Sequence, residues 1–316
     1  MSVDQIHTFA FDDVPIRGRV VTLTDAWQKI RSRQTYAPDP ERVLGEMVAI
    51  VAMLAQGIKL DGSVILQMRG NGPIRTAMAE CTDRTTLRAT MRTANNSSNA
   101  TGATSSQHDG QLAITLKPHR GAMYQGIVPL NAAVVPLDGV VPLDGKVVPL
   151  GEVSVPRAVE AYFDTSEQLP TRVWAAANTE GVAGLLLQRM PNPQGAPAEL
   201  VDQIDESWRR VQLLADTVTD HDLLTISADQ LLRRLFHEEA VRLQPPLDLE
   251  FGCSCSRERT ANALRIMGRA EIDEILAEER SIDVTCEFCG KNYRYDPIDA
   301  QLLFEPLAQV VPETPH

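Results

Sequence analysis

Hydrophobic residues in the first 90 positions follow two different periods. Residues 19–23 and 63–68 are short apolar runs, which predicts two strands. Between them, after Asp39 and Pro40, apolar residues recur at the spacing of one helix face. These residues are Val43, Met47, Ile50, Val51 and Leu54. A strand, a helix and a strand fit either an α/β or an α+β domain, and we expect α+β.

Two segments interrupt this pattern. Residues 94–110 contain almost no apolar side chains, which predicts a flexible loop or linker before strand character resumes at residues 111–116. Residues 134–151 repeat Val-Pro-Leu three times. The recurring proline excludes a helix or a central strand there, so the repeat is a run of short extended turns or an exposed insertion. We assign it no function.

The chain becomes helical from Ala198. One face of this first predicted helix is apolar, through Leu200, Ile204, Trp208, Val211, Ala215 and Val218. A second helix is predicted to begin at Ser227, because Gln230 three residues later completes a capping box. Its apolar residues are Leu231, Leu232, Leu235, Phe236 and Val241. The helix should end before Pro245 and Pro246, the clearest boundary in the chain.

These signals divide the 316 residues into three parts. We expect a mixed α+β core domain over residues 1–195, a helical linker over 196–246 and a small C-terminal domain over 247–316. No apolar run approaches the roughly 20 residues of a membrane span, and the N-terminus lacks the features of a signal peptide. We therefore expect a cytoplasmic protein without a membrane partner. The net charge of −12 disfavours nucleic acid as a partner.

Four of the five cysteines lie in the last quarter, as Cys253-Ser-Cys255 and Cys286-Glu-Phe-Cys289. Two thiol pairs joined by a segment long enough to fold back are typical of a site that binds one Zn²⁺ through four sulfurs. The first pair has one intervening residue, where structural zinc sites usually have about two to four. Its closely held sulfurs suit metal binding and can also oxidise to each other. A purely structural zinc site and a thiol switch both remain open.

The predicted surroundings of the cysteines form a small unit. Ser256 can cap a helix that ends near Gly268, and residues 271–280 predict a second helix. Residues 282–286 and 291–295 predict a hairpin with the second cysteine pair at its tip. So few residues cannot bury a self-sufficient core, whereas structural zinc contributes on the order of 10–16 kcal/mol to folding. Loss of the metal should therefore unfold the unit.

The rest of the sequence contains no signature of an active site. Cys81 stands alone without a histidine partner, and we interpret it as a buried, inert thiol. The histidines form no metal motif, and neither a Ser-His-Asp signature, a phosphate loop nor a dinucleotide fingerprint is present. We therefore expect a protein that is not an enzyme.

Residues 251–259, Phe-Gly-Cys-Ser-Cys-Ser-Arg-Glu-Arg, with Cys286-Glu-Phe-Cys289 and Tyr293, resemble a known family. It is the bacterial redox-regulated heat-shock chaperone family, the 33-kilodalton heat-shock protein. Further segments in the family's order are residues 59–63, 70–73, 124–126, 166–171 and 186–191. The resemblance covers nearly the whole chain, and residues 94–110 and 134–151 depart from it as insertions.

This resemblance implies an ATP-independent holdase with an α+β core, a helical linker and a zinc domain. The reduced form would hold one Zn²⁺ on Cys253, Cys255, Cys286 and Cys289 and be inactive. Oxidation would form the disulfides Cys253–Cys255 and Cys286–Cys289, release zinc, and unfold the switch domain and the linker. The exposed surface would bind unfolding client proteins, in a homodimer.

The linker helices have apolar faces that must pack on something when the chaperone is inactive. Trp208, Leu231, Leu235 and Phe236 are the candidate packing residues and, once released, candidate client contacts. Two other hypotheses remain. A constitutive zinc ribbon would bind a partner without any redox change. A thiol oxidoreductase would use Cys286 and Cys289, but it needs a thioredoxin-like βαβ setting instead of a hairpin.

Overall fold

The computed structural model describes residues 4–58, 61–94, 110–130 and 154–304. Contacts divide the chain into two compact units, Met1–Gly252 and Cys253–His316. Residues 196–246 belong to the first unit by these contacts, so a separate linker stays a prediction. The predicted boundary at Pro245 and Pro246 differs from the observed one, because the chain past the prolines adds two short strands to the first unit.

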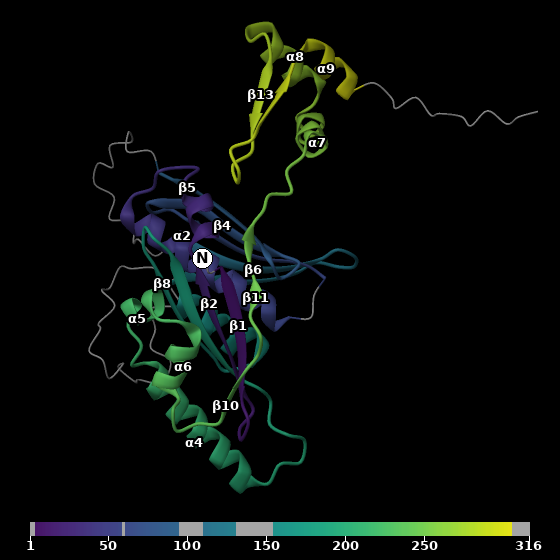
Figure 1. The fold of residues 1–316 in the computed structure, drawn as a ribbon. Helices are drawn as coiled ribbons and strands as arrows, with labels where there is room; N and C mark the ends of the chain where they lie inside the picture. Colours follow the sequence, from purple (N-terminus) through teal and green to yellow (C-terminus); the bar gives the residue numbers. More distant parts are fainter. Residues whose placement is uncertain (1–3, 59–60, 95–109, 131–153, 305–316) are drawn as a thin grey trace, which may run out of the picture. The chain divides into compact units, whose positions relative to one another are not determined.

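The described residues of the first unit form two six-stranded sheets (Figure 1). The first sheet has the order β10-β1-β2-β9-β8, with β11 also paired to β1, and all its pairings are antiparallel. Its strands are β1 (Gln5–Phe11), β2 (Ile16–Leu23), β8 (Thr171–Ala177), β9 (Val182–Arg189), β10 (Val241–Leu243) and β11 (Leu247–Asp248). The predicted strand at residues 19–23 is confirmed within β2.

The second sheet has the order β12-β5-β4-β3-β6-β7, antiparallel except for the parallel pair β12 and β5. Its strands are β3 (Gly62–Gly70), β4 (Ile74–Thr82), β5 (Thr86–Thr93), β6 (Gly110–Pro118), β7 (Tyr124–Pro129) and β12 (Glu250–Phe251). The predicted strands at residues 63–68 and 111–116 are therefore confirmed. Antiparallel sheets with separate helices make the fold α+β, as expected.

Helix α2 (Pro38–Gly57) lies between the two sheets and confirms the predicted helix. Every residue from Val43 to Ala55 is buried, because apolar side chains of both sheets surround the helix. Gly45 allows a close approach: a Cβ there would lie 2.4 Å from the Cβ of Ala177. Helices α1 (Asp25–Arg31) and α3 (Val155–Tyr162) flank this core, and a π-helical turn, η3 (Phe163–Glu167), follows α3.

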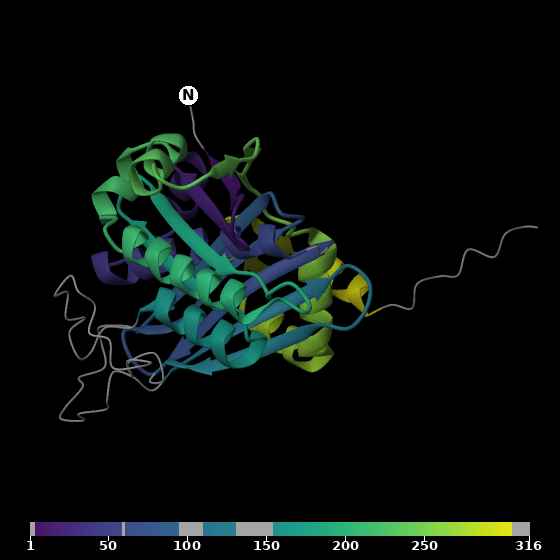
Figure 2. The ribbon, with the colours of Figure 1, turned by 90° about the horizontal axis from the view of Figure 1, so that it is seen from below.

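The segment after the core covers the other face of the first sheet with three helices (Figures 1 and 2). They are α4 (Ala198–Ala215), α5 (Asp220–Thr225) and α6 (Ala228–Leu235). The capping box of Ser227 and Gln230 is confirmed. Helix α6 is shorter than predicted, because Val241 pairs with Phe11 as part of β10.

Two further details of this segment differ from the sequence prediction. Helix α5 was not expected, although Thr219 and Asp222 form its capping box. Leu200, predicted on the apolar face of α4, is 38% exposed because the first turn of the helix extends beyond the cluster that buries Trp208 and Val211.

The second unit contains three helices and a hairpin among its described residues. These elements are α7 (Arg257–Met267), α8 (Arg269–Glu278), β13 (Ile282–Thr285), β14 (Asn292–Tyr295) and α9 (Pro297–Leu303). The predicted cap at Ser256, both helices and the hairpin are confirmed. Helix α9 was not expected, although Asp296, Pro297 and Asp299 form a helix start with a capping box.

Residues 95–109 and 131–153, which carry nearly all of both predicted insertions, lie outside the described residues. Among the residues that the structure describes, no helix is long and apolar enough to cross a membrane.

Candidate metal centre

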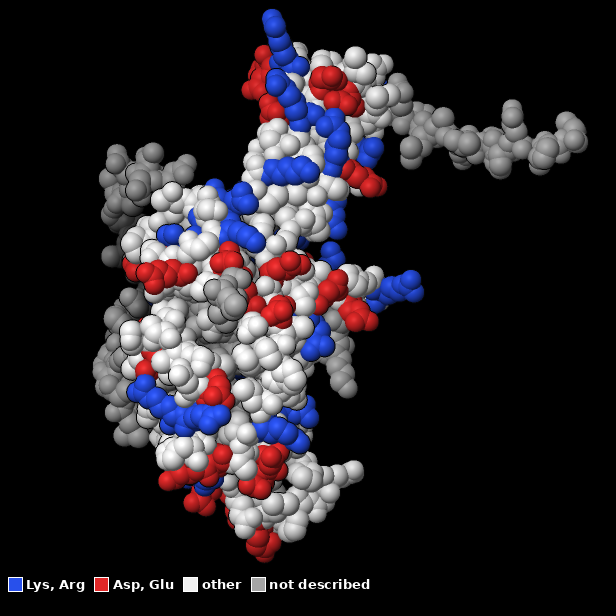
Figure 3. Space-filling view, viewed as in Figure 1, with Lys and Arg blue, Asp and Glu red and all other residues white. Residues whose placement is uncertain are grey.

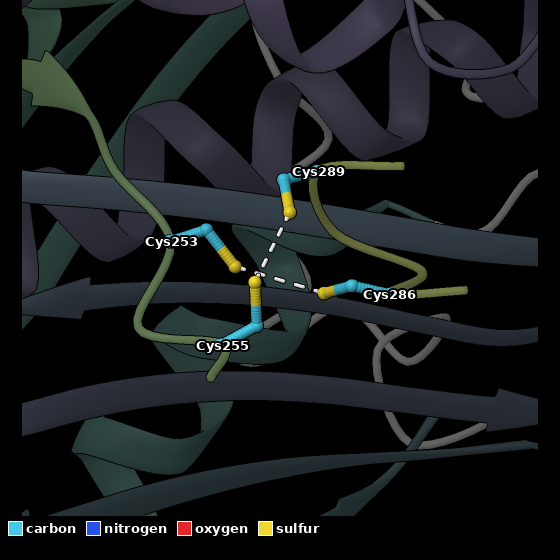
Figure 4. A group of neighbouring side chains, drawn as sticks. All are labelled: Cys253, Cys255, Cys286 and Cys289. Atoms are coloured by element: carbon cyan, nitrogen blue, oxygen red, sulfur yellow. Dashed lines mark hydrogen bonds between the residues drawn. The ribbon is translucent and has the colours of Figure 1, made fainter. Parts of the chain in front are cut away.

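Two short segments of the second unit supply the four cysteines (Figure 4). Cys253 and Cys255 directly precede α7, whose N-terminus is capped by Ser256 Oγ accepting the Arg259 N–H. Cys286 and Cys289 form the tip of the β13–β14 hairpin. The Cys286 N–H donates to the Lys291 carbonyl, and the Gly290 N–H donates to the Cys286 carbonyl.

The tip of the hairpin depends on one glycine. Gly290 has φ of +70°, in the left-handed region where a side chain is unfavourable. This turn directs the sulfurs of Cys286 and Cys289 toward those of the first pair (Figure 4). The sequence therefore positions one thiol pair by a helix cap and the other by a tight turn.

The geometry of the four sulfurs fits a tetrahedral metal ion. All four Sγ atoms lie within 4.8 Å of one another. Cys253 Sγ lies 3.7 Å from Cys286 Sγ, and Cys255 Sγ lies 3.3 Å from Cys289 Sγ. A zinc ion bound at about 2.3 Å from each sulfur places its ligands about 3.8 Å apart. Four half-buried thiols at this spacing can hold a metal ion, and their softness favours Zn²⁺.

Hydrogen bonds to the sulfurs shift their protonation equilibria in different directions. Burial alone would raise the pKa of Cys255, but hydrogen bonds from the Tyr293 hydroxyl and the other thiols outweigh it and lower that pKa to about 7. Burial raises the pKa of Cys289 to about 12 and also raises the pKa of Cys253. The hydrogen bond to Cys255 raises the pKa of Tyr293 to about 12, so this phenol remains a donor.

Arg257 connects the first cysteine pair to the rest of the unit. Its guanidinium lies 4.4 Å from the centroid of the Tyr295 ring, donates to the Arg294 carbonyl at 2.9 Å and pairs with Asp299 at 2.7 Å. The Tyr295 hydroxyl donates to the Arg257 carbonyl in return, at 2.7 Å. These contacts fix the start of α7, and with it Cys255, against β14 and α9.

Comparison with known proteins gives the family of this chain. The family model described as Hsp33 protein matches residues 4–139 and 135–296. This chain belongs to the Hsp33 family. A 33 kDa chaperonin from Methylobacillus flagellatus is 36% identical, with 95% of this chain and 94% of the relative covered. A 33 kDa chaperonin from Ectopseudomonas mendocina is 38% identical, with 99% of each chain covered.

The fold of this Hsp33-family chain also matches a solved structure. The crystal structure of the 33 kDa chaperonin from Thermotoga maritima aligns with a TM-score of 0.72 and covers 95% of this chain and 97% of that chain. The two sequences are 19% identical, so this likeness supports the fold alone. The membership in a chaperone family that the sequence resemblance implied is confirmed by the family match and the curated relatives.

Proton competition gives a first testable property of the centre. A bound metal holds the cysteines as thiolates, so its affinity falls as the pH falls. Because Cys253 and Cys289 have raised pKa values, at least two protons leave for each metal bound near neutral pH. We expect zinc affinity to fall at least about 100-fold from pH 8 to pH 7, and more steeply below about pH 7, where Cys255 also binds a proton. Competition with a chelator at each pH measures this slope, and a flat profile would contradict thiolate ligation.

Cys81 lies on β4 in the first unit and takes no part in the cluster. It is fully buried, and burial raises its pKa to about 12. Because the thiolate is the reactive species, we expect iodoacetamide to leave Cys81 unmodified in the native protein at pH 8 and to modify it after denaturation. Mass spectrometry of the Cys81 peptide measures both states. Modification of Cys81 without denaturant would contradict its interpretation as a buried, inert thiol.

The four predicted linker residues are buried in one apolar cluster on the outer face of the first sheet. Trp208, Leu231, Leu235 and Phe236 pack there with Phe9, Phe11, Leu185 and Leu187. The Phe236 ring centroid lies 5.2 Å from that of Phe11 and 6.2 Å from that of Phe9. An ion pair between Arg189 and Asp205 and a hydrogen bond from Trp174 Nε1 to Asp216 also join the helices to the sheet. Client contact by these residues stays a prediction.

Sequence reasoning missed the roles of Tyr293 and Arg257. Tyr293 appeared in the family resemblance without a function, although the strand period of the predicted hairpin places it on the same face as Tyr295. From this alternation, both tyrosines could have been predicted to face the interior of the unit. Arg257 had no such signal, because its partners become neighbours only when α7, β14 and α9 pack together.

Proposed function

We propose that this Hsp33-family chain is a redox-regulated, ATP-independent holdase. In the reduced form, one Zn²⁺ per chain is bound by Cys253, Cys255, Cys286 and Cys289, and the chaperone is inactive. The observation that carries the proposal is the convergence of the four sulfurs from two segments of one small unit. The protein acts by binding other proteins and not by catalytic turnover.

The small size of the second unit makes zinc decisive for its stability. Its buried apolar cluster comprises eight of the described residues, drawn from short helices and one hairpin. Zinc binding contributes on the order of 10–16 kcal/mol to comparable units, whereas whole domains are stable by about 5–15 kcal/mol. Loss of the metal therefore unfolds the unit.

Oxidation removes the ligands that zinc requires. In each cysteine pair, the two thiolates give two electrons to the oxidant as an S–S bond forms. The pairing Cys253–Cys255 and Cys286–Cys289 follows the family resemblance. A disulfide sulfur no longer carries thiolate charge, so zinc is released. Each disulfide closes a loop too short to offset the lost binding energy.

Three short strands connect the helices α4–α6 to the second unit along the chain. The chain leaves α6 and passes through β10, β11 and β12 directly into Cys253. Strands of two or three residues contribute few hydrogen bonds and open at low free-energy cost. Unfolding that begins at Cys253 can therefore detach these strands and then the helices.

Release of α4–α6 would expose both sides of the apolar cluster. Trp208, Leu231, Leu235 and Phe236 would become accessible, together with the sheet face that they now cover. Exposed apolar surfaces of this kind bind other proteins. We propose that unfolding client proteins bind there and that the oxidised chaperone is a homodimer.

The charge distribution supports protein clients over nucleic acid. On the face shown in Figure 3, basic side chains gather on the C-terminal unit with acidic side chains beside them, and both signs alternate over the first unit. The chain as a whole carries a net charge of −12. Phosphate backbones require clustered Lys and Arg, so nucleic acid is not a proposed partner. We also propose a cytoplasmic location, where thiols are kept reduced until oxidants accumulate.

Aggregation assays of the two redox forms test this function. A chemically unfolded client is diluted, without ATP, into buffer that contains either the reduced, zinc-loaded protein or the peroxide-treated protein. We expect the oxidised form alone to suppress light scattering, and peptide mapping to find the two local disulfides. Equal activity of both forms, or none in either, would instead support a constitutive zinc ribbon.

A further inference from the structure

Arg19 is a buried cation in the first unit. It lies on β2, on the same face as Val21 and Leu23, which pack in the core cluster around α2. Arg19 is only 6% exposed, and its buried Nε has no hydrogen-bond partner among the described residues. Arginine is almost never buried unless its charge is paired. A guanidinium in this state indicates a place for an anion.

The guanidinium of Arg19 packs against the last residue of α2. A Cβ atom at Gly57 would lie 2.6 Å from Nη2 of Arg19 and 2.9 Å from its Cζ, so the missing side chain makes room for the cation. The C-terminal end of a helix carries about half of an elementary negative charge. This partial charge offsets the cation at Arg19 without neutralising it.

Two further arginines lie beside Arg19, one from each sheet. Arg17 is on the same face of β2, and Arg84 is in the turn between β4 and β5. Arg84 Nε and Nη2 donate to Gln56 Oε1 at 3.1 Å and 2.8 Å, and Gln56 Nε2 donates to the Arg84 carbonyl at 2.6 Å. These bonds hold Arg84 at the last turn of α2. Burial, and then the like charges of Arg17 and Arg84, lower the pKa of Arg19 to about 10, so it stays charged near neutral pH.

The carboxylates nearest to Arg84 in the chain have other partners. Asp83 Oδ1 lies 2.7 Å from His119 Nε2, and Glu80 accepts a hydrogen bond from Arg88 Nε. The charged groups that act on Arg19 are both arginines, and no carboxylate of the described residues is among them. The cluster therefore has an excess of positive charge, although the chain as a whole carries −12.

We propose that Arg17, Arg19 and Arg84 form a binding site for one phosphoryl group, either as inorganic phosphate or in a phosphate ester. Guanidinium groups donate pairs of hydrogen bonds that match the spacing of phosphate oxygens. A tetrahedral phosphate presents oxygens to donors from several directions, whereas a carboxylate presents two oxygens in one plane. The bound group would connect the two sheets at the end of α2. The site lies within the first unit and does not depend on the proposed redox function.

Calorimetric titration of the reduced, zinc-loaded full chain with inorganic phosphate tests this site. The buffer is free of phosphate and is held at constant ionic strength with sodium chloride. We expect one phosphate to bind per chain, and binding to be at least about tenfold weaker in Arg19→Gln and in Arg84→Gln. Arg75→Gln is the matched control, because Arg75 is an exposed arginine near the opposite end of β4. This variant should keep the parental affinity.

The variants separate a binding site from a structural role. Arg84 is exposed, so Arg84→Gln decides the question if Arg19→Gln does not fold. No binding to the parent protein would overturn the inference, and so would parental affinity in Arg84→Gln. An equal loss of affinity in Arg75→Gln would also overturn it, because attraction to overall charge would then explain the binding. Titration with glycerol 3-phosphate distinguishes the two sources: tighter binding than inorganic phosphate identifies an ester as the ligand, and weaker binding identifies the free ion.

Discussion

Replacing Cys286 with serine is expected to unfold the C-terminal unit even under reducing conditions. A serine hydroxyl is not a thiolate ligand, so Cys286→Ser removes one of four donors and most of the zinc-binding free energy. That energy is on the order of 10–16 kcal/mol, which exceeds what eight buried apolar residues can supply. We expect zinc content to fall far below one ion per chain, and trypsin to cleave residues 253–304 rapidly while the first unit resists.

Cys81→Ala is the matched control for this experiment. It also removes one thiol, but from the buried face of β4, where it leaves only a small cavity. This variant should keep one zinc ion per chain and a protease-resistant C-terminal unit. If Cys286→Ser kept one zinc ion per chain and resisted trypsin like the parent protein, the four cysteines would not form the zinc site.

The second large effect concerns the apolar surface beneath α6. Aspartate at both Leu231 and Leu235 places two charges in a cluster where these side chains are 1% and 4% exposed. Each buried charge costs at least about 3 kcal/mol, from lost packing and desolvation. We expect the helices α4–α6 to detach in reductant, so that protease cleaves between residues 198 and 243 and client binding appears without peroxide.

Leu213→Asp provides the control for this pair. Leu213 lies on α4 and is 48% exposed, so its replacement adds a charge to the same segment without burying it. This variant should remain resistant to protease and inactive until oxidised. Unchanged cleavage in the double variant would mean that α6 does not hold the segment in place. Cleavage without any client binding would separate release of the helices from chaperone activity.

Much of the fold was predictable because local signals agreed with tertiary packing. The helix at residues 38–57 and the hairpin at residues 282–295 each carry a clear period and clear end signals. Strand β9 was not predicted, because it is buried on both faces and its apolar run fits a buried helix segment as well as a strand. Strands β10, β11 and β12 are too short for any period, and they exist only because β1 and β5 offer partners.

The four cysteines of the candidate site could be predicted from the sequence, whereas the residues that contact them could not. Spacing alone indicated Cys253, Cys255, Cys286 and Cys289, because thiol pairs at that separation have few other uses in a reducing compartment. The hydrogen bond from Tyr293 to Cys255 depends on how β14 faces the start of α7. That contact joins residues far apart in the chain, so the local pattern of apolar and polar residues cannot predict it.

Simultaneous measurement of zinc release and chaperone activity tests the central claim most directly. Peroxide is added to the reduced, zinc-loaded protein, and a metal indicator and the light scattering of an unfolding client are followed in the same sample. A redox-switched holdase predicts that zinc leaves and that aggregation is suppressed in step. Retention of zinc, or its release without any suppression of aggregation, would contradict the account and make the centre a structural zinc site.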